Sequence, residues 1–213
     1  MFGAFARAIQ SLLDIVLPRK ERVIRIEHYS LEDIPVAPQE HDACGVQITT
    51  LMHYREKAVE DLIRALKYDR SGHAARLLAG ALAEYLHEEV ANLKNFSTKP
   101  IVLIPVPLHA SRERERGFNQ IQKVLDALPR EFKDGSMSRI ESHALVRTRA
   151  TPQQTRLSRR DRLSNVAGAF ALARPIEDSH IILIDDVTTT GATMAEAARS
   201  LKGIVTLLAL AHA

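Results

Sequence analysis

IILIDDVTTTGAT, at residues 181–193, carries the strongest structural signal in the chain. Four apolar residues lead into the adjacent carboxylates Asp185 and Asp186, and a threonine-rich turn then runs through Gly191 into a helical pattern. A continuous apolar run of this length is typical of a strand buried on both faces of a parallel sheet. Because such sheets bind ligands at the carboxyl ends of their strands, we expect the acidic pair to lie in a binding crevice.

The residues after this strand predict a phosphate site. Two adjacent carboxylates repel each other unless they accept hydrogen bonds from paired hydroxyls or face a divalent cation. The following turn offers hydroxyl groups and backbone N–H groups at a helix N-terminus, where the helix dipole favours an anion. The expected phosphate-binding residues are Thr188, Thr189, Thr190, Gly191, Ala192 and Thr193. The alternative is that Asp185 only caps the helix and the threonines only pack.

Apolar runs and helical patterns alternate through the second half of the chain. The expected strands are 101–106, 143–146, 168–173, 181–185 and 204–211, and the expected helices are 57–68, 73–91, 118–128 and 191–201. This alternation predicts an α/β fold in which helices cover both faces of a mostly parallel, twisted sheet. We expect the α/β core to span about 99–213.

The N-terminal quarter of the chain reads differently. Apolar residues at three- and four-residue spacings predict an amphipathic helix over 2–17, which either packs on the chain or meets a partner helix or a membrane surface. Residues 18–50 predict an irregular arm with one or two short strands, one of them at VIRI, 23–26. We therefore divide the chain into a helix and hood arm at 1–50 and an α/β domain at 51–213. The apolar face of the 2–17 helix also suggests a homodimer.

The stretch 181–193 resembles the phosphoribosyl-pyrophosphate signature of type I phosphoribosyltransferases. More narrowly, the chain resembles the ComF family of competence-related proteins over about residues 50–213, and three segments support this, namely 62–86, 104–120 and 145–170. The family usually begins with a zinc ribbon of paired cysteines. This chain has only Cys44, with His41 beside it, so we expect the zinc site to be lost.

The resemblance implies a Mg²⁺-dependent transfer of ribose 5-phosphate from phosphoribosyl pyrophosphate to a nucleobase or another amine. Asp185 and Asp186 would hold the ribose hydroxyls, contact Mg²⁺ directly or through water, and stabilise positive charge on the sugar in the transition state. The loop after the 101–106 strand would meet the pyrophosphate. Its candidate residues are Arg112, Arg114, Arg116, Asn119 and Gln120, of which Arg112 and Arg116 are the catalytic candidates.

An arginine-rich run at 147–162 concentrates the basic excess of the chain. It holds six arginines and one acid, whereas the whole chain carries a formal charge of only +3. We expect a loop here that closes over the pyrophosphate and excludes water, through Arg147, Arg149 and Gln154. A solvated basic face and a contact with the phosphate backbone of a nucleic acid are the alternatives.

Composition excludes several other classes of protein. Aromatic residues make up 5% of the 213 residues and none is Trp, which disfavours binding of single strands by base stacking. A single cysteine forbids an intramolecular disulfide and fits a reducing, cytoplasmic setting. No apolar run is long enough to cross a membrane. Two hypotheses remain: a phosphoribosyltransferase, and a non-catalytic module for competence and DNA uptake that senses the nucleotide and binds nucleic acid or a partner protein.

Overall fold

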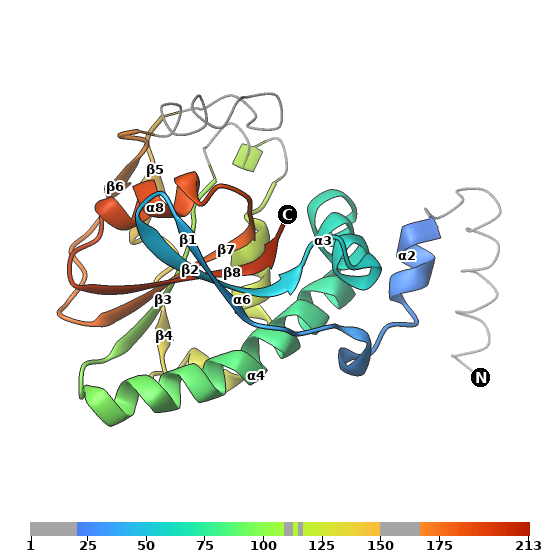
Figure 1. The fold of residues 1–213 in the computed structure, drawn as a ribbon, viewed down its shortest axis with the longest axis horizontal. Helices are drawn as coiled ribbons and strands as arrows, with labels where there is room; N and C mark the ends of the chain where they lie inside the picture. Colours follow the sequence, from blue (N-terminus) through green and yellow to red (C-terminus); the bar gives the residue numbers. More distant parts are fainter. Residues whose placement is uncertain (1–20, 109–112, 115–116, 150–166) are drawn as a thin grey trace.

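The computed structural model describes residues 21–108, 113–114, 117–149 and 167–213 (Figure 1). Within these residues the main element is a six-stranded sheet of order β1-β2-β8-β7-β3-β4. Its neighbouring strands run parallel except for the β1–β2 hairpin at one edge. The strands are β1 (Gln39–Ala43), β2 (Val46–His53), β3 (Ile101–Pro105), β4 (Arg139–Ile140), β7 (His180–Thr188) and β8 (Ile204–His212). The prediction of a mostly parallel α/β fold, consistent with that of type I phosphoribosyltransferases, is confirmed.

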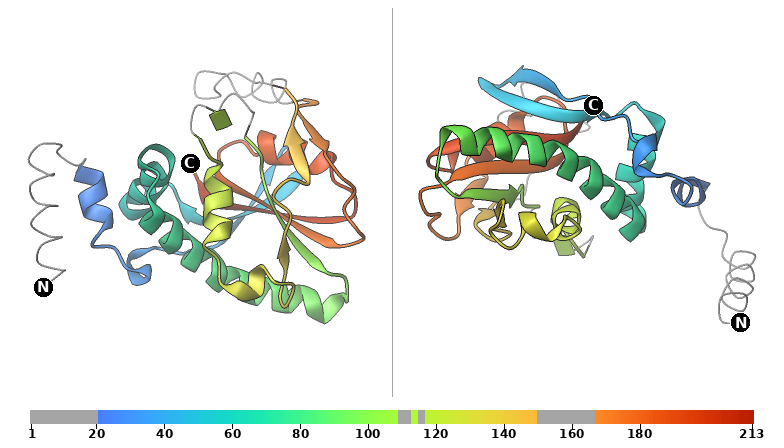
Figure 2. Two further views of the ribbon diagram at one scale, coloured as in Figure 1. Left: turned by 180° about the vertical axis from the view of Figure 1, so that it is seen from behind. Right: turned by 90° about the horizontal axis from the view of Figure 1, so that it is seen from below.

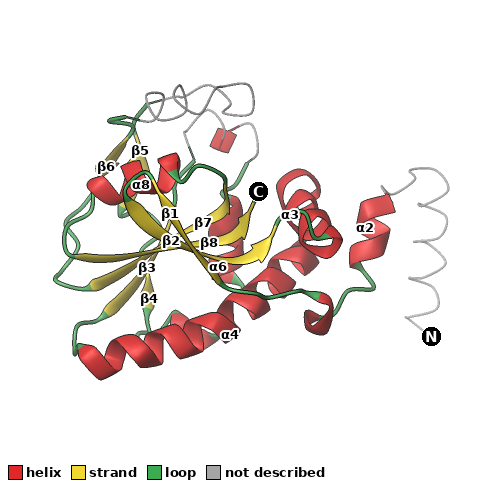
Figure 3. Cartoon of the chain, viewed as in Figure 1, coloured by secondary structure: helices red, strands yellow, loops and turns green. Residues whose placement is uncertain are grey.

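Helices cover both faces of this sheet (Figures 2 and 3). The described helices are α2 (Glu21–Ile26), α3 (Lys57–Asp69), α4 (Gly72–Phe96), α6 (Gln120–Asp126) and α8 (Ala192–Arg199), with 3-10 turns η1 (Leu31–Asp33) and η2 (Arg130–Phe132). Helices α3, α4 and α6 pack with Ile182 and Ile184 in one core, and α8 packs with Ile181 and Leu183 in another. Successive strand residues point to opposite faces, so a continuous apolar run serves both cores.

The predicted helices at 57–68 and 73–91 are confirmed as α3 and α4, and α4 continues to Phe96. Arg70 ends α3 in the left-handed region, with φ 52°. The Ser71 side chain then accepts a hydrogen bond from the backbone N–H of Ala74 and caps α4. The two helices therefore meet at a tight corner, which positions the C-terminal end of α3.

The prediction of a strand at 23–26 is wrong, because these residues lie in α2. β-branched residues favour strands only weakly, and tertiary contacts decide here. Ile26 is buried in the core, and Arg25 donates two hydrogen bonds to the buried carboxylate of Asp61 in α3, at 2.8 and 3.0 Å. The predicted helix at 2–17 lies outside the described residues.

The sheet includes residues that precede the expected start of the α/β core near residue 99. β2 pairs in parallel with β8, and β1 pairs with β2, so residues 39–53 form one edge of the sheet. The expected boundary between residues 50 and 51 falls inside β2. The hairpin turns at Cys44 and Gly45, both with positive φ, as a two-residue type I′ turn requires.

Two of the expected strands belong to a separate sheet. β5 (Leu145–Arg147) and β6 (Phe170–Leu172) pair with each other in an antiparallel ladder and do not join the main sheet. They pack over α8, and Phe170 lies in the same core as Leu183. None of the described helices is both long and apolar enough to cross a membrane.

Candidate functional site

The acidic pair lies at the carboxyl end of β7, next to the end of β3. Residue Ile184 pairs with Pro105, and the backbone N–H of Val106 donates to the Ile184 carbonyl at 2.8 Å. The loop that follows β3 therefore starts beside Asp185. This arrangement is the crevice in which open parallel sheets bind ligands.

Backbone and side-chain donors hold the two carboxylates. The backbone N–H groups of Asp186 and Val187 donate to Oδ1 of Asp185 and Asp186, at 2.8 and 2.7 Å. Lys67 Nζ, from α3, lies 2.9 Å from Asp186 Oδ2. Lys67 is not among the predicted site residues, although it lies in the segment 62–86 that carries the family resemblance. Its contact with Asp186 joins residues over 100 positions apart, which no local pattern reveals.

Burial, together with the charge of Asp186, raises the pKa of Asp185 to about 7. The Asp186 backbone N–H, Lys67 and Arg147 act in the opposite direction. A nearby cation or a hydroxyl donor would stabilise the charged form of a carboxyl group whose pKa is raised in this way. The donor set of two hard carboxylates therefore suits Mg²⁺.

The turn at 188–191 is held by residues from outside the stretch 181–193. Thr188 is buried, and its carbonyl accepts from the backbone N–H of Ala213 at 3.0 Å. The Thr189 carbonyl lies 3.3 Å from His212 Nε2, and Cys44 Sγ donates to the Thr190 carbonyl at 3.0 Å. These carbonyls therefore face β8 and the hairpin.

Gly191 is required here by the hairpin. Its φ is +71°, and a Cβ atom at this position would lie 2.5 Å from the Cβ of Ala43 and 2.7 Å from Cδ1 of Ile48. Helix α8 begins at the next residue, Ala192, and Thr193 stands in its first turn. The predicted phosphate-binding residues thus form one turn into a helix N-terminus; phosphate binding by them stays a prediction.

The loop after β3 is described only in part. Arg112 and Arg116 lie outside the described residues, and Arg114 is exposed. Asn119 has a structural role: Oδ1 accepts from Ile121 N to cap α6, and Nδ2 donates to the Val106 carbonyl, both at 3.0 Å. The Gln120 side chain is buried, and its Nε2 has no partner among the described residues.

Arg147, in the described part of the arginine-rich run, lies near enough to the acidic pair for its charge to act on Asp185. Its guanidinium carbon lies 5.2 Å from the centre of the Phe170 ring. The exposed Arg149 donates to the Ala167 carbonyl at 2.9 Å. Gln154 lies outside the described residues, as does most of the run.

A pocket of about 360 Å³ lies between the turn at 188–191 and the β1–β2 hairpin, lined by residues of that turn together with His41, Asp42 and His212. The rings of His41 and His212 stack with centroids 4.3 Å apart. Burial, with His212 and His53 nearby, lowers the pKa of His41. Within the described residues, no group of three or more His, Cys, Asp or Glu side chains is placed to hold a metal ion.

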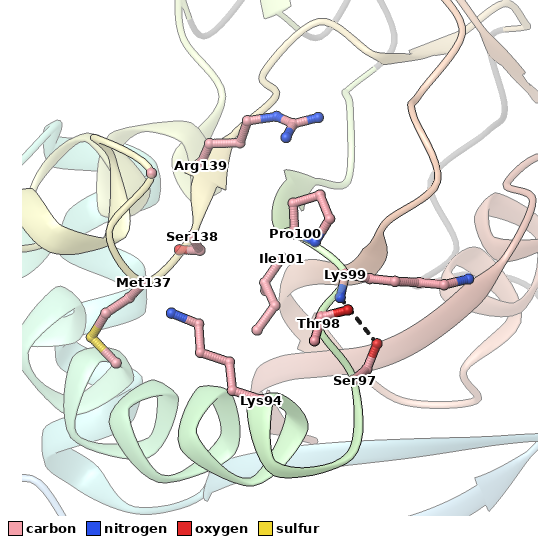
Figure 4. Close-up of a pocket in the computed structure, with 10 residues that line it drawn as sticks. Lys94, Ser97, Thr98, Lys99, Pro100, Ile101, Met137, Ser138 and Arg139 are labelled. Carbon is pink, nitrogen blue, oxygen red and sulfur yellow. Dashed lines mark hydrogen bonds between the residues drawn. The ribbon is translucent and has the colours of Figure 1, made fainter.

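A separate pocket of about 420 Å³ opens at the other end of the sheet, where α4 ends and β3 and β4 begin (Figure 4). Its cations already have partners. Lys94 Nζ donates to the Ser136 carbonyl at 2.8 Å, Lys99 lies 2.7 Å from Asp178, and Arg139 lies 3.4 Å from two glutamates. The carboxyl end of β7 therefore remains the better candidate site.

The chain is similar to several curated bacterial proteins. It is 38% identical over 142 residues to the DNA utilization protein YhgH of Escherichia coli O6:H1, a match that covers 66% of this chain and 59% of the relative. It is 32% identical over 153 residues to competence protein F of Haemophilus influenzae, covering 70% and 64%. It is 36% identical over 108 residues to competence protein ComFC of Bacillus subtilis, covering 51% and 41%. The chain thus spans less than two thirds of the length of these relatives. No family model matches it.

Proposed function

Because the chain belongs to the ComF family, we propose that it binds phosphoribosyl pyrophosphate with Mg²⁺ and transfers ribose 5-phosphate to a nucleobase or another amine in the cytoplasm. The observation that carries this proposal is the half-buried acidic pair near the end of β7, just before a threonine-rich turn into α8.

In the proposed reaction, the bond between ribose C1 and the pyrophosphate oxygen breaks, and its electron pair leaves with pyrophosphate. The acceptor nitrogen forms a new bond to C1 and loses a proton. Positive charge develops on the ribose between these events, and Asp185 and Asp186 would stabilise it and hold the ribose hydroxyls. Mg²⁺ would neutralise charge on the departing pyrophosphate.

The remaining residues would position the ligand. The 5-phosphate would bind the N–H groups and hydroxyls of 188–193, where the dipole of α8 favours an anion. The charge of Arg147 acts on Asp185 against the rise in the pKa of that carboxyl, so the Arg147 side chain would also lie near a ribose bound there. Arg112, Arg114, Arg116 and Arg149 stay candidates for the pyrophosphate.

The test is calorimetric titration of phosphoribosyl pyrophosphate with and without Mg²⁺. The wild type should bind with micromolar affinity, about 8 kcal/mol, only when Mg²⁺ is present. The double variant Asp185→Asn, Asp186→Asn should lose at least about 100-fold in affinity, because both charges that face the ligand are removed.

The matched control is Glu177→Gln with Asp178→Asn, an exposed acidic pair just before β7 at the opposite end of the same strand. This variant removes the same charge and should bind as the wild type does. Equal binding by all three proteins would show that the acidic pair of β7 is not the site.

Binding of nucleic acid is the second candidate, favoured by the six arginines of 147–162 and by relatives named for DNA utilization and competence. If about five phosphates of a single-stranded oligonucleotide were neutralised, affinity should fall about 100-fold between 50 and 200 mM salt. Fluorescence anisotropy of a labelled oligonucleotide measures this. Weak binding that does not change with salt would reject this candidate.

A further inference from the structure

Lys67 connects the acidic pair to a helix outside the nucleotide motif. Its Nζ lies 2.9 Å from Asp186 Oδ2, and both side chains are largely buried, with exposed fractions of 22% and 15%. A lysine with no role beyond the surface of its helix would extend into solvent. This one is directed at the carboxylate to which we assign a role in ligand binding.

The same end of α3 also borders the loop after β3. The Arg70 guanidinium lies 5.8 Å from the centre of the Phe118 ring, and its Nη2 lies 3.0 Å from the position of a Cβ atom on Gly117. Lys123, in α6, donates to the Arg70 carbonyl at 2.5 Å. Lys67 stands in the last turn of α3, three positions before Arg70, the residue at which the helix ends. Lys67 therefore lies where the acidic pair and the predicted pyrophosphate loop come together.

The contact with Asp186 is not needed to hold α3 in place. Leu62, Ile63 and Leu66 are fully buried in the core. The far side of the helix is tied to α2 by Arg25, which pairs with Asp61. An additional partly buried ion pair adds little to stability, since desolvation offsets its attraction.

We propose that Lys67 is a pyrophosphate-binding residue that neutralises Asp186 until the ligand arrives. This inference rests on the proposed function. Mg²⁺ and the ribose hydroxyls would then replace Lys67 as the partners of the Asp186 carboxylate. The Lys67 ammonium group, on its flexible four-carbon chain, would turn to the nearest anionic oxygens of the ligand. Those oxygens belong to the pyrophosphate group, which carries the highest charge on the ligand. Lys67 would thus exchange one anion for another and stay paired throughout.

The experiment compares Lys67→Met with Arg64→Met, which lies one turn earlier on α3 and pairs only with the solvent-accessible Glu60 in the described contacts. Each protein is titrated in Mg²⁺ with phosphoribosyl pyrophosphate, with pyrophosphate, and with ribose 5-phosphate. Lys67→Met should weaken binding of the first two ligands about 10- to 100-fold, the loss expected for one charge-assisted hydrogen bond. It should leave ribose 5-phosphate binding within about twofold. Lys67→Arg should recover part of the loss, and Arg64→Met should match the wild type.

Two results would overturn the inference. One is unchanged affinity of Lys67→Met for pyrophosphate and for phosphoribosyl pyrophosphate. The other is an equal loss for all three ligands together with a lowered melting temperature, which would make the Lys67–Asp186 pair structural. If the wild type binds pyrophosphate through Lys67 but does not bind phosphoribosyl pyrophosphate, the proposed function fails and this inference stands. If it binds neither ligand, both fail.

Discussion

At the scale of single residues, we expect Asp185 to lower the stability of the protein at neutral pH. The pKa of Asp185 is about 7 in the folded chain, against an ordinary value of 3.8. Between these values the folded chain keeps a proton that the unfolded chain has released, so the free energy of unfolding falls as pH rises. A site built to bind a cationic or hydroxyl-bearing ligand pays this cost when the ligand is absent.

Asp185→Asn should therefore be more stable than the wild type at pH 7.5, and the difference should vanish near pH 4. A difference of three pKa units corresponds to at most about 4 kcal/mol. Urea denaturation at pH 4.5, 6.0 and 7.5 in a chelator of divalent ions measures it, with Asp178→Asn as the control. Lower stability of Asp185→Asn at pH 7.5 would mean that the charged carboxylate is stabilised by its partners.

At the scale of secondary-structure elements, the β1–β2 hairpin and the turn at 188–191 are packed against each other through Gly191. Gly191→Ala would place a Cβ atom 2.5 Å from Ala43 and force an alanine to adopt a φ of +71°. The free energy of unfolding should fall by about 2–4 kcal/mol, because overpacking and backbone strain each cost about 1–3 kcal/mol. Chemical denaturation measures this loss.

Gly135→Ala is the matched control for Gly191→Ala. Gly135 also has a positive φ, +92°, but a Cβ atom there would meet nothing within 4 Å. This variant therefore isolates the cost of the backbone conformation, and it should lose about 1 kcal/mol. If both variants lost the same amount, the hairpin would yield to the added methyl group and would not constrain the turn.

The elements that could be predicted from the sequence are those whose signal is local. β3 and β7 are short, continuous apolar runs rich in β-branched residues, which indicates strands. α3 and α4 repeat apolar residues at helical spacing, which indicates helices. α2 was mistaken for a strand because Ile26 and Arg25 are held by partners in α3. The structure of such a short segment depends on contacts with residues distant in the sequence, and the spacing of its apolar residues does not reveal these contacts.

The candidate site shows the same division. Asp185 and Asp186 were predicted from a compact motif, whereas Lys67 reaches them from a helix more than 100 residues earlier. Asn119 has a polar side chain in a predicted ligand loop, yet both of its polar ends bind the backbone. Residue type and position indicate which groups are near a site, but only the packing of elements decides which of them face it.

At the scale of the whole molecule, ligand binding should stabilise the entire α/β domain, because β7 pairs with β8 from His180 to Thr188 and with β3 from His180 to Ile184. A ligand that binds only the folded chain adds about 2.7 kcal/mol at 100 times its dissociation constant. For a chain of this size the melting temperature should rise by about 5–10 °C with phosphoribosyl pyrophosphate and Mg²⁺ together.

Calorimetric melting of the wild type, the Asp185→Asn, Asp186→Asn variant and the Glu177→Gln, Asp178→Asn control measures this rise. The control should shift as the wild type does and the β7 variant should not, since its site is disabled. An equal rise in the β7 variant would place the ligand elsewhere on the molecule.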